Sequence, residues 1–319
     1  MKQLEEIPHY ICNPEDKNVV AYIDTDSVYV DAEPILKHLN PNFIDLDDKE
    51  KDDFLEKIAL KYQDLITSHY DVLAKECFNI PEIIGEKKHN HVLEMKTEAV
   101  IRAAYFRATR RYAQWITKKE GIVKEELDIK GLEFMKANFP PIFGKFFFNL
   151  VEEILKGLPQ EDALNKIKFF RNQILKGEIP LTKLGNPTSV KKIHDYEGTK
   201  VRSGEIFSTI KKGAPAPVRA AIKYNDLLRL WRLDGKYNYI TSSDKVKWIY
   251  MKDNPYKIEA LAFLDWGIPE KINDFLEKYA DRDKIFETIL LNKLEGFFSD
   301  LGFELNLNPY LNKFKTIEI

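Results

Sequence analysis

Cysteine is nearly missing from this chain of 319 residues, in which Cys12 and Cys77 are the only two. Small secreted domains are commonly stabilised by several disulfides, and two cysteines so far apart do not form such a framework. The low cysteine content therefore favours a reducing compartment, and we expect a cytoplasmic protein.

Long hydrophobic runs are missing as well. A membrane-spanning helix needs about 18 to 20 consecutive apolar residues, and the longest candidate, residues 143–155, is interrupted by Lys145 and by Glu152 and Glu153. Residues 1–6 lack the apolar segment of a signal peptide. We expect no association with a membrane.

A large net charge is the third absence, since 49 basic and 51 acidic residues give a formal charge of −2. The charges are unevenly distributed, however. Residues 41–60 hold seven acids against three lysines, and residues 181–236 hold twelve bases against five acids. A basic segment is the electrostatic footprint expected where a protein contacts nucleic-acid phosphates. The alternative is that both segments are solvated charge runs.

The length and the apolar patterns predict an α+β protein with two domains. In the first, apolar runs at 18–23 and 28–31 predict a β-hairpin with carboxylates at its tip, and helical spacing predicts a helix over 48–76. Further strands are expected within 91–116. The two prolines that follow Phe139 place the predicted domain boundary between residues 137 and 138.

The second domain, residues 138–319, is predicted to be mainly helical. The expected helices cover 143–156, 160–176, 219–230, 268–279 and 283–301, with a loop-rich basic region before Pro217.

Two aspartates at the predicted hairpin tip are the first candidate site. Asp24 and Asp26 lie two residues apart, between Tyr22 and Ser27. Carboxylate oxygens suit Mg²⁺, which takes one or two carboxylates from a protein and keeps several waters. An Asp-x-Asp pair alone is common in surface turns, so its context decides what it indicates.

The hexapeptide Tyr22–Ser27 (Tyr-Ile-Asp-Thr-Asp-Ser) resembles motif C of family B DNA polymerases. The resemblance implies that Asp26 is a catalytic aspartate and the main ligand of Mg²⁺ in a two-metal site, and that Asp24 is a supporting catalytic acid. The family usually has glycine at the position of Ile23. The two domains would then be the C-terminal part of the palm, an antiparallel sheet with helices, and the thumb.

Downstream segments extend this resemblance in order along the chain. Glu98 falls where the family often has a further acid near the metal, and residues 109–113 resemble its Lys-Lys-Arg-Tyr motif. The resemblance thus implies that Arg110, Arg111 and Tyr112 contact the primer end, although Thr109 replaces a base.

Two further segments are matched beyond that motif. Lys130 opens a segment that resembles the family's next block, and residues 213–225 are similar to the thumb of T-even-type phage polymerases. We therefore expect Lys130, Lys211, Lys212 and Arg219 to contact DNA as well.

The family's motif A aspartate, its nucleotide-binding helix and its exonuclease acids do not occur in this sequence. We therefore expect one subunit of a split polymerase, active only with an N-terminal subunit that brings the exonuclease, fingers and motif A, and acting on primer-template DNA and dNTP. A short apolar segment near the C-terminus, 308–314 or 317–319, is a candidate for binding a sliding clamp.

Two alternatives remain open from the sequence. The chain could be a truncated form of a single-chain polymerase. It could also be a non-catalytic DNA-binding or accessory subunit in which the polymerase motif is vestigial.

Overall fold

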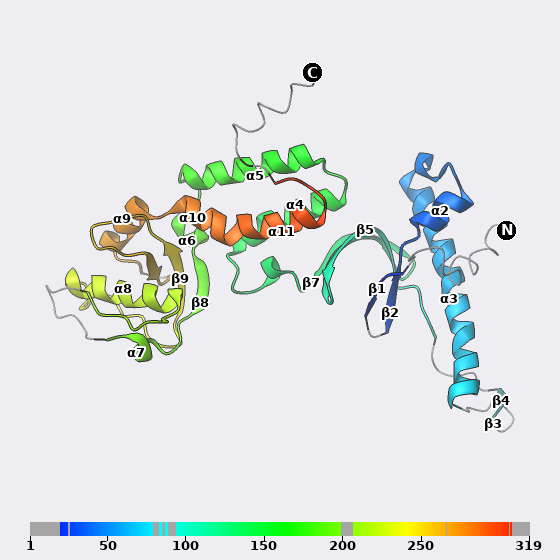
Figure 1. Cartoon of the computed structure of the whole chain (residues 1–319), viewed down its shortest axis with the longest axis horizontal. Coiled ribbons are helices and arrows are strands. Elements are labelled where there is room, and N and C mark those ends of the chain that lie inside the picture. The colour runs from blue at the N-terminus through cyan, green and yellow to red at the C-terminus, as the bar shows by residue number, and fades with distance from the viewer. Residues whose placement is uncertain are drawn as a thin grey trace, which may run out of the picture. The chain divides into compact units, whose positions relative to one another are not determined.

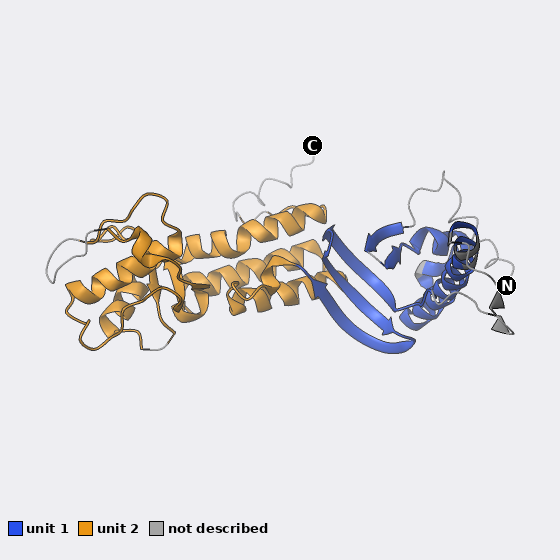
Figure 2. Ribbon diagram, turned by 90° about the horizontal axis from the view of Figure 1, so that it is seen from below, with its two compact units in different colours: residues 1–131 blue, residues 132–319 orange. Residues whose placement is uncertain are grey.

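A computed structural model gives the chain an α+β fold in which the strands of the described residues pair antiparallel. The residues that the structure describes are 20–24, 26–78, 83–84, 87–88, 94–198, 207–265, 267–305 and 307. The chain divides into two compact units, Met1–Gly131 and Leu132–Ile319 (Figure 2). Within these described ranges, no helix is both long enough and apolar enough to cross a membrane.

Unit 1 combines small sheets with one long helix (Figure 1). Its elements are β1 (Val20–Asp24), β2 (Ser27–Val30), α2 (Glu33–Leu39), the 3-10 turn η2 (Phe43–Asp45), α3 (Asp48–Phe78), β3 (Ile83–Ile84), β4 (Lys87–Lys88), β5 (Ala99–Ala108), β6 (Arg111–Lys119) and β7 (Ile122–Lys130).

The predicted hairpin and the predicted long helix are both confirmed. In the hairpin, Asp24 pairs with Ser27, which leaves two residues between the strands, the shortest common hairpin connection. The Ser27 hydroxyl donates to the Asp24 carbonyl oxygen at 3.1 Å and so stabilises this tip.

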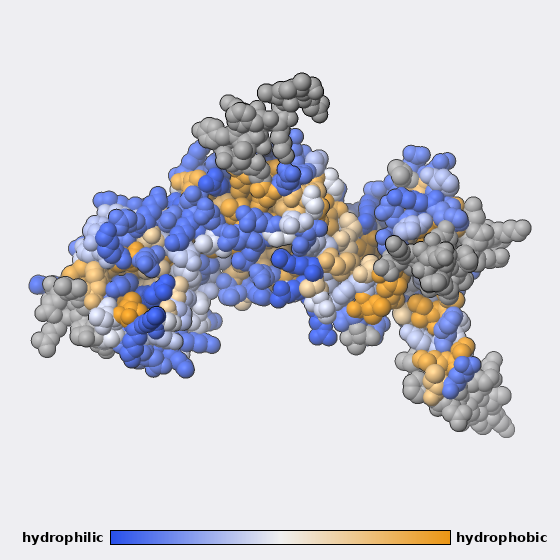
Figure 3. Space-filling model, in the orientation of Figure 1, coloured by the Kyte–Doolittle hydropathy of each residue, from blue (hydrophilic) through white to orange (hydrophobic). Residues whose placement is uncertain are grey.

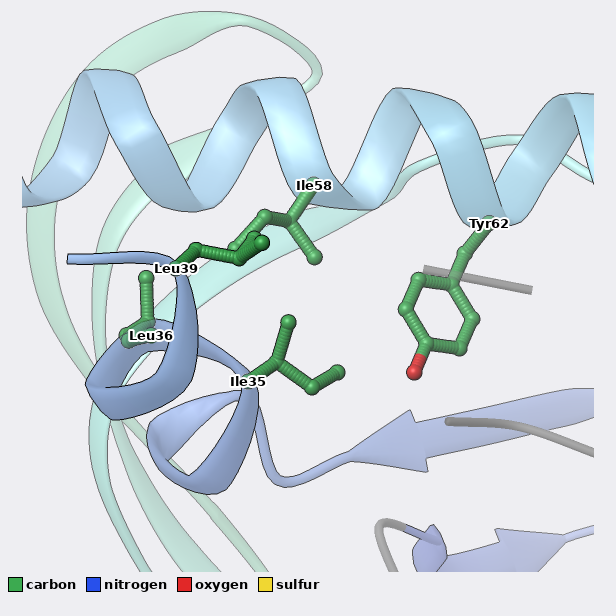
Figure 4. Close-up of a cluster of buried hydrophobic side chains, with 5 residues drawn as sticks. All are labelled: Ile35, Leu36, Leu39, Ile58 and Tyr62. Carbon is green, nitrogen blue, oxygen red and sulfur yellow. The ribbon is translucent and has the colours of Figure 1, made fainter. Parts of the chain in front are cut away.

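A small core joins α2 to α3 (Figure 4). Ile35, Leu36 and Leu39 of α2 are buried against Ile58 and Tyr62 of α3. Burial raises the pKa of Tyr62 to about 12, and its hydroxyl has no hydrogen-bond partner among the described residues.

Ion pairs hold α3 against the three-stranded sheet β5–β6–β7. They join two bases of the sheet to four acids of the helix and are Arg102–Asp48 at 2.7 Å, Arg102–Asp52 at 3.0 Å, Lys118–Asp53 at 2.6 Å and Lys118–Glu56 at 2.9 Å. Four of the seven acids of the run at 41–60 therefore form ion pairs within the protein, although the side chains of Asp48 and Asp53 stay largely exposed to solvent.

The sheet has the order β5–β6–β7, and β6 is its central strand. We expected strands within 91–116, but β7 was not predicted. Its sequence is rich in lysine and glutamate, which are depleted in strands, and most of its first residues are exposed. The turn between β6 and β7 uses Glu120 and Gly121, both with positive φ, as a tight hairpin requires.

Unit 2 packs helices around a second three-stranded sheet. Its elements are the 3-10 turn η3 (Glu133–Met135), α4 (Pro141–Leu155), α5 (Gln160–Leu175), α6 (Leu181–Leu184), β8 (Asn186–Ser189), α7 (Ile193–Tyr196), α8 (Ala216–Leu230), β9 (Lys245–Tyr250), β10 (Ala260–Phe263), α9 (Glu270–Tyr279), α10 (Arg282–Phe286), the π-helical turn η4 (Glu287–Leu291) and α11 (Asn292–Asp300).

Four of the five predicted helices of this unit are confirmed to within a few residues at their ends, and the fifth, 283–301, is divided into α10, the π-helical η4 and α11. The sheet, in the order β10–β9–β8, was not predicted. Stacked rings join η3, α4 and α5. The ring centroids of Phe134 and Phe147 are 4.3 Å apart, and those of Phe146 and Phe170 are 4.2 Å apart.

The units divide between Gly131 and Leu132, whereas the predicted domain boundary lies between residues 137 and 138. Pro140 and Pro141, on which the predicted boundary was based, form the start of helix α4. Pro140 is the N-cap of α4 and Pro141 its first residue, where the missing N–H of proline costs no helical hydrogen bond.

Candidate functional site

Two carboxylates lie at the tip of the β1–β2 hairpin. Asp24 ends β1 and is about 29% exposed, and Asp26 lies in the turn and is exposed. The guanidinium of Arg110 reaches the Asp24 carboxylate, with 3.6 Å between Nε and Oδ2. The structure therefore places Arg110 against Asp24, which lies two residues before Asp26 at the same hairpin tip.

An aromatic cluster anchors the hairpin to the sheet. Tyr22 of β1 and Tyr29 of β2 meet Phe106 of β5 and Tyr112 of β6, and the ring centroids of the six pairs lie 5.1 to 6.2 Å apart. The Tyr22 hydroxyl also accepts a hydrogen bond of 2.8 Å from the Arg110 backbone N–H. Because aromatic rings bury a large contact area, these contacts attach the two strands of the hairpin to the β5–β6–β7 sheet.

Two tyrosine hydroxyls of the aromatic cluster share a hydrogen bond. Burial raises the pKa of Tyr29 far above its usual value, and the bond that its hydroxyl donates to Tyr112 raises it further. Burial also raises the pKa of Tyr112. Both hydroxyls therefore stay neutral at physiological pH.

The β5–β6 turn that carries Arg110 has a strained backbone. Arg110 has φ of 59°, in the left-handed region that non-glycine residues rarely adopt. Gly131, with φ of 67°, lies directly against this turn, and a Cβ at position 131 would collide with the Arg110 carbonyl oxygen. Gly131 is required for this close approach.

The other two bases predicted near this turn lie beside it, on β6 and β7. Arg111 begins β6, is exposed and has its stem beside Gly131. Lys130, the last residue of β7, pairs with Tyr112 in the sheet and has its Nζ 5.6 Å from that ring's centroid. The predicted residues Arg110, Arg111, Tyr112 and Lys130 thus form one basic edge beside the hairpin.

Glu98 is placed differently. Its carbonyl oxygen accepts a 2.7 Å hydrogen bond from Glu120 in the β6–β7 turn, at the end of the sheet opposite the Arg110 turn. The sheet is curved (Figure 2), and the Glu98 carboxylate is near enough to raise the pKa of Tyr29 and Tyr112. The role of Glu98 as a metal ligand stays a prediction.

The hairpin tip suits a hard cation in its donor type. Asp24 and Asp26 offer carboxylate oxygens, and Mg²⁺ accepts one or two of these with water and phosphate oxygens. Among the described residues, no group of three or more acids, histidines or cysteines could hold a metal ion. These two aspartates are the residues that would hold magnesium here.

The predicted DNA contacts of unit 2 lie on a turn before α8 and in the first turns of that helix. Lys211 and Lys212 are exposed, and the Lys211 backbone N–H donates to the Tyr196 carbonyl oxygen at 2.9 Å. Arg219 lies in the first turns of α8, with its guanidinium 4.0 Å from the Glu259 carboxylate.

A buried ionic network supports this turn. Asp226 is fully buried and accepts from the Ser208 hydroxyl at 2.6 Å and from Arg229 at 3.1 Å. Arg229 also donates to Glu197 at 3.2 Å. Because a buried carboxylate without partners is costly, this network fixes the segment that leads to Lys211.

Sequence reasoning missed two residues of the site. Phe106 is brought to the hairpin by long-range packing, and alternation along 99–108 was the only signal that could have assigned it to the hairpin side of the sheet. Gly131 follows Lys130 in the sequence, and its positive φ has no local signal beyond the glycine itself. The segments predicted to bind a clamp, 308–314 and 317–319, lie outside the described residues.

Comparison of the chain with models of known protein families and with curated proteins finds no match. The resemblance to family B DNA polymerases therefore depends on the motif residues of this chain and on their arrangement in the structure.

Proposed function

We propose that this chain is the motif C and thumb part of a family B DNA polymerase. It would supply Asp26 and Asp24, a basic edge for the primer and a phosphate-binding surface, while the motif A acid, fingers and exonuclease come from polypeptide outside these 319 residues. The observation that carries the proposal is the Tyr22–Ser27 hexapeptide at a hairpin tip, held against the Arg110 turn.

The residues have distinct roles in this function. Magnesium, when bound, would activate the primer hydroxyl and neutralise charge on the nucleotide's phosphates. Asp26 is exposed and free to act as a ligand, and Asp24 stays beside Arg110. Arg111 presents an exposed guanidinium, which can donate two parallel hydrogen bonds to a phosphate.

Exposed apolar side chains on unit 1 favour the proposal that a partner polypeptide binds this unit. Figure 3 shows apolar surface over the hairpin and along part of α3, where Ile23 is 64% and Val72 50% exposed. Among the described residues, neither outer edge of the β1–β2 hairpin pairs with another strand. An added strand would satisfy such an edge and cover the apolar side chains.

The test is primer extension by this chain together with a polypeptide that carries the missing motifs. Asp26→Asn should lower the rate of nucleotide addition by about 10³-fold, because a neutral amide is a poor Mg²⁺ ligand. The affinity for primer-template DNA should change by about two-fold or less, since Asp26 is not placed among the phosphate contacts.

The matched control is Asp45→Asn, a change of the same charge at an exposed acid of the same unit. It should leave both nucleotide addition and DNA affinity at the wild-type level. Full activity of the Asp26→Asn complex would contradict the proposal.

One observation favours a second candidate function. The ion pair between Asp24 and Arg110 gives the acid a structural role without any metal, as expected of a non-catalytic DNA-binding subunit. In that case Asp26→Asn would leave synthesis by the complex unchanged, while removal of the whole chain would still weaken DNA binding.

A further inference from the structure

Unit 2 contains a cleft that the proposed function does not use. It has a volume of about 450 Å³, within the usual range for small-molecule sites. Five segments that are distant in sequence form it: η3 with the loop before α4, β8, the first turn of α8 at Pro217, β9, and the helical run from η4 into α11. The lining residues used below are Lys136, Asn138, Asn186, Trp248, Tyr250 and Lys293.

The charge in the cleft favours an anion. Lys136 and Lys293 both line it, and neither has an ion partner among the residues that the structure describes. Lys293 lies with its Nζ 5.5 Å from the centroid of the Phe139 ring, which is a further lining residue. Glu133 is the one acid among the lining residues, so the two lysines leave a positive balance.

Aromatic side chains form one wall. Trp248 and Tyr250 lie on the same face of β9, and their ring centroids are 5.0 Å apart. Tyr250 is half-buried, and Lys284 has its Nζ 4.9 Å from the centroid of that ring. The two rings are inclined by 73° and Trp248 is buried, so the half-buried Tyr250 ring is the one on which a planar group can stack. Nucleobases of any kind stack on aromatic side chains.

Amide groups complete the set of functional groups. Asn138 and Asn186 line the cleft, and each side chain offers both a donor and an acceptor. Asn186 pairs with Trp248 across β8 and β9, which puts its amide beside the aromatic wall. The edge of a nucleobase requires this mixture of donors and acceptors, whereas a simple anion requires only donors.

The backbone is irregular at the same cleft. The turn Glu287–Leu291 is π-helical, and Thr288 and Ile289 of this turn are lining residues. A π turn replaces regular helical hydrogen bonds and is frequently found at functional sites. Here it places two side chains in the cleft within a helical run that is otherwise regular.

We infer that this cleft binds one nucleotide unit, with the base against Tyr250 and the 5′-phosphate near Lys136 and Lys293. The unit belongs to a single strand of nucleic acid or to a free nucleotide, which share this chemistry. The inference depends on unit 2 alone and does not require the polymerase function.

The test measures binding of a fluorescent hexathymidylate to the full chain by anisotropy. All proteins carry Lys211→Ala and Lys212→Ala, so that the turn before α8 does not contribute. In this background Lys136→Ala with Lys293→Ala should weaken binding about ten-fold or more. Lys145→Ala with Lys176→Ala, an equal charge change at exposed lysines of α4 and of the C-cap of α5, should weaken it about two-fold or less.

A second pair of variants tests stacking without a change of charge. Tyr250→Ala should weaken binding about ten-fold, whereas Tyr250→Phe keeps the ring and should bind like the parent. Thymidine 5′-monophosphate should compete at concentrations where inorganic phosphate does not. Equal competition by the monophosphate and by unlabelled hexathymidylate would identify a free nucleotide as the ligand, and tighter binding of the hexamer would identify a strand.

Two results would overturn the inference. Equal losses of affinity in the cleft and control lysine pairs would show general electrostatic attraction. Competition by inorganic phosphate as strong as that by the nucleotide would show an anion site that does not recognise the base.

Discussion

At the scale of single residues, the candidate site depends on a glycine and an arginine that have left-handed backbones. Arg110 occupies its strained turn because its backbone N–H bonds to Tyr22 and its side chain reaches Asp24. Gly131 makes room for the carbonyl oxygen of that same arginine. Strain of this kind persists only where surrounding contacts enforce it.

Gly131→Ala should destabilise unit 1 by about 3 kcal/mol, since it adds a steric collision to the cost of a left-handed alanine. Gly121→Ala is the matched control. Gly121 also has a positive φ, but its added Cβ would meet only the Glu56 carboxylate, at an ordinary 3.7 Å. That variant should be destabilised by about 1 kcal/mol. Hydrogen exchange of the β5–β7 amides in urea measures the loss of stability in both variants. Equal destabilisation by the two substitutions would argue against a close approach between Gly131 and Arg110.

At the scale of elements, the docking of α3 on the sheet depends on charge. Lys118 is buried, and its hydrogen bonds to Asp53 and Glu56 raise its pKa above the ordinary 10.5. The bond from Lys118 lowers the pKa of Asp53 below the ordinary 3.8. The stabilisation from Lys118 is present below pH 10.5 and disappears as pH rises further, and that from Asp53 is present above pH 3.8 and disappears as pH falls further.

Lys118→Met should therefore lower the melting temperature most at neutral pH and least at the two extremes. The methionine keeps the apolar stem and removes the charge. Lys61→Met, at an exposed position of α3, is the control and should follow the wild type at every pH. A constant difference between Lys118→Met and wild type across the pH range would point to poorer packing instead.

The elements also show how far sequence reasoning reaches. The hairpin, α3 and the helices of unit 2 were predicted because periodicity and turn chemistry are local signals. The strand β7 was missed since its charged residues obscure alternation, and the sheet of unit 2 was missed because β8 contains proline and asparagine. The contact of Phe106 with the hairpin and the π turn of η4 arise from tertiary packing, which no local pattern records.

At the scale of the whole molecule, the two units divide the proposed work. Unit 1 holds the carboxylates and the basic edge, and unit 2 holds the Lys211–Lys212 turn. Contacts to phosphates release counterions, so the logarithm of DNA affinity falls linearly with the logarithm of salt concentration.

We expect replacement of Lys211, Lys212 and Arg219 by alanine to make the slope of log affinity against log salt concentration less negative by about 2 to 3. This is close to one unit of slope for each phosphate that these side chains would bind. The matched control replaces Lys145, Lys168 and Lys176, which lie on α4, on α5 and at the C-cap of α5. Titrations of duplex DNA at several salt concentrations measure both slopes. An unchanged slope in the first variant would remove the turn from the DNA-binding surface.

The open edges of the β1–β2 hairpin have a practical consequence for handling the protein. Among the described residues, this two-stranded sheet has unpaired edges and an exposed isoleucine near its tip, which make it a template for pairing with a second copy of itself. We expect the purified chain to self-associate as its concentration rises, and co-expression with a polypeptide that occupies the edge to increase the yield of monodisperse protein.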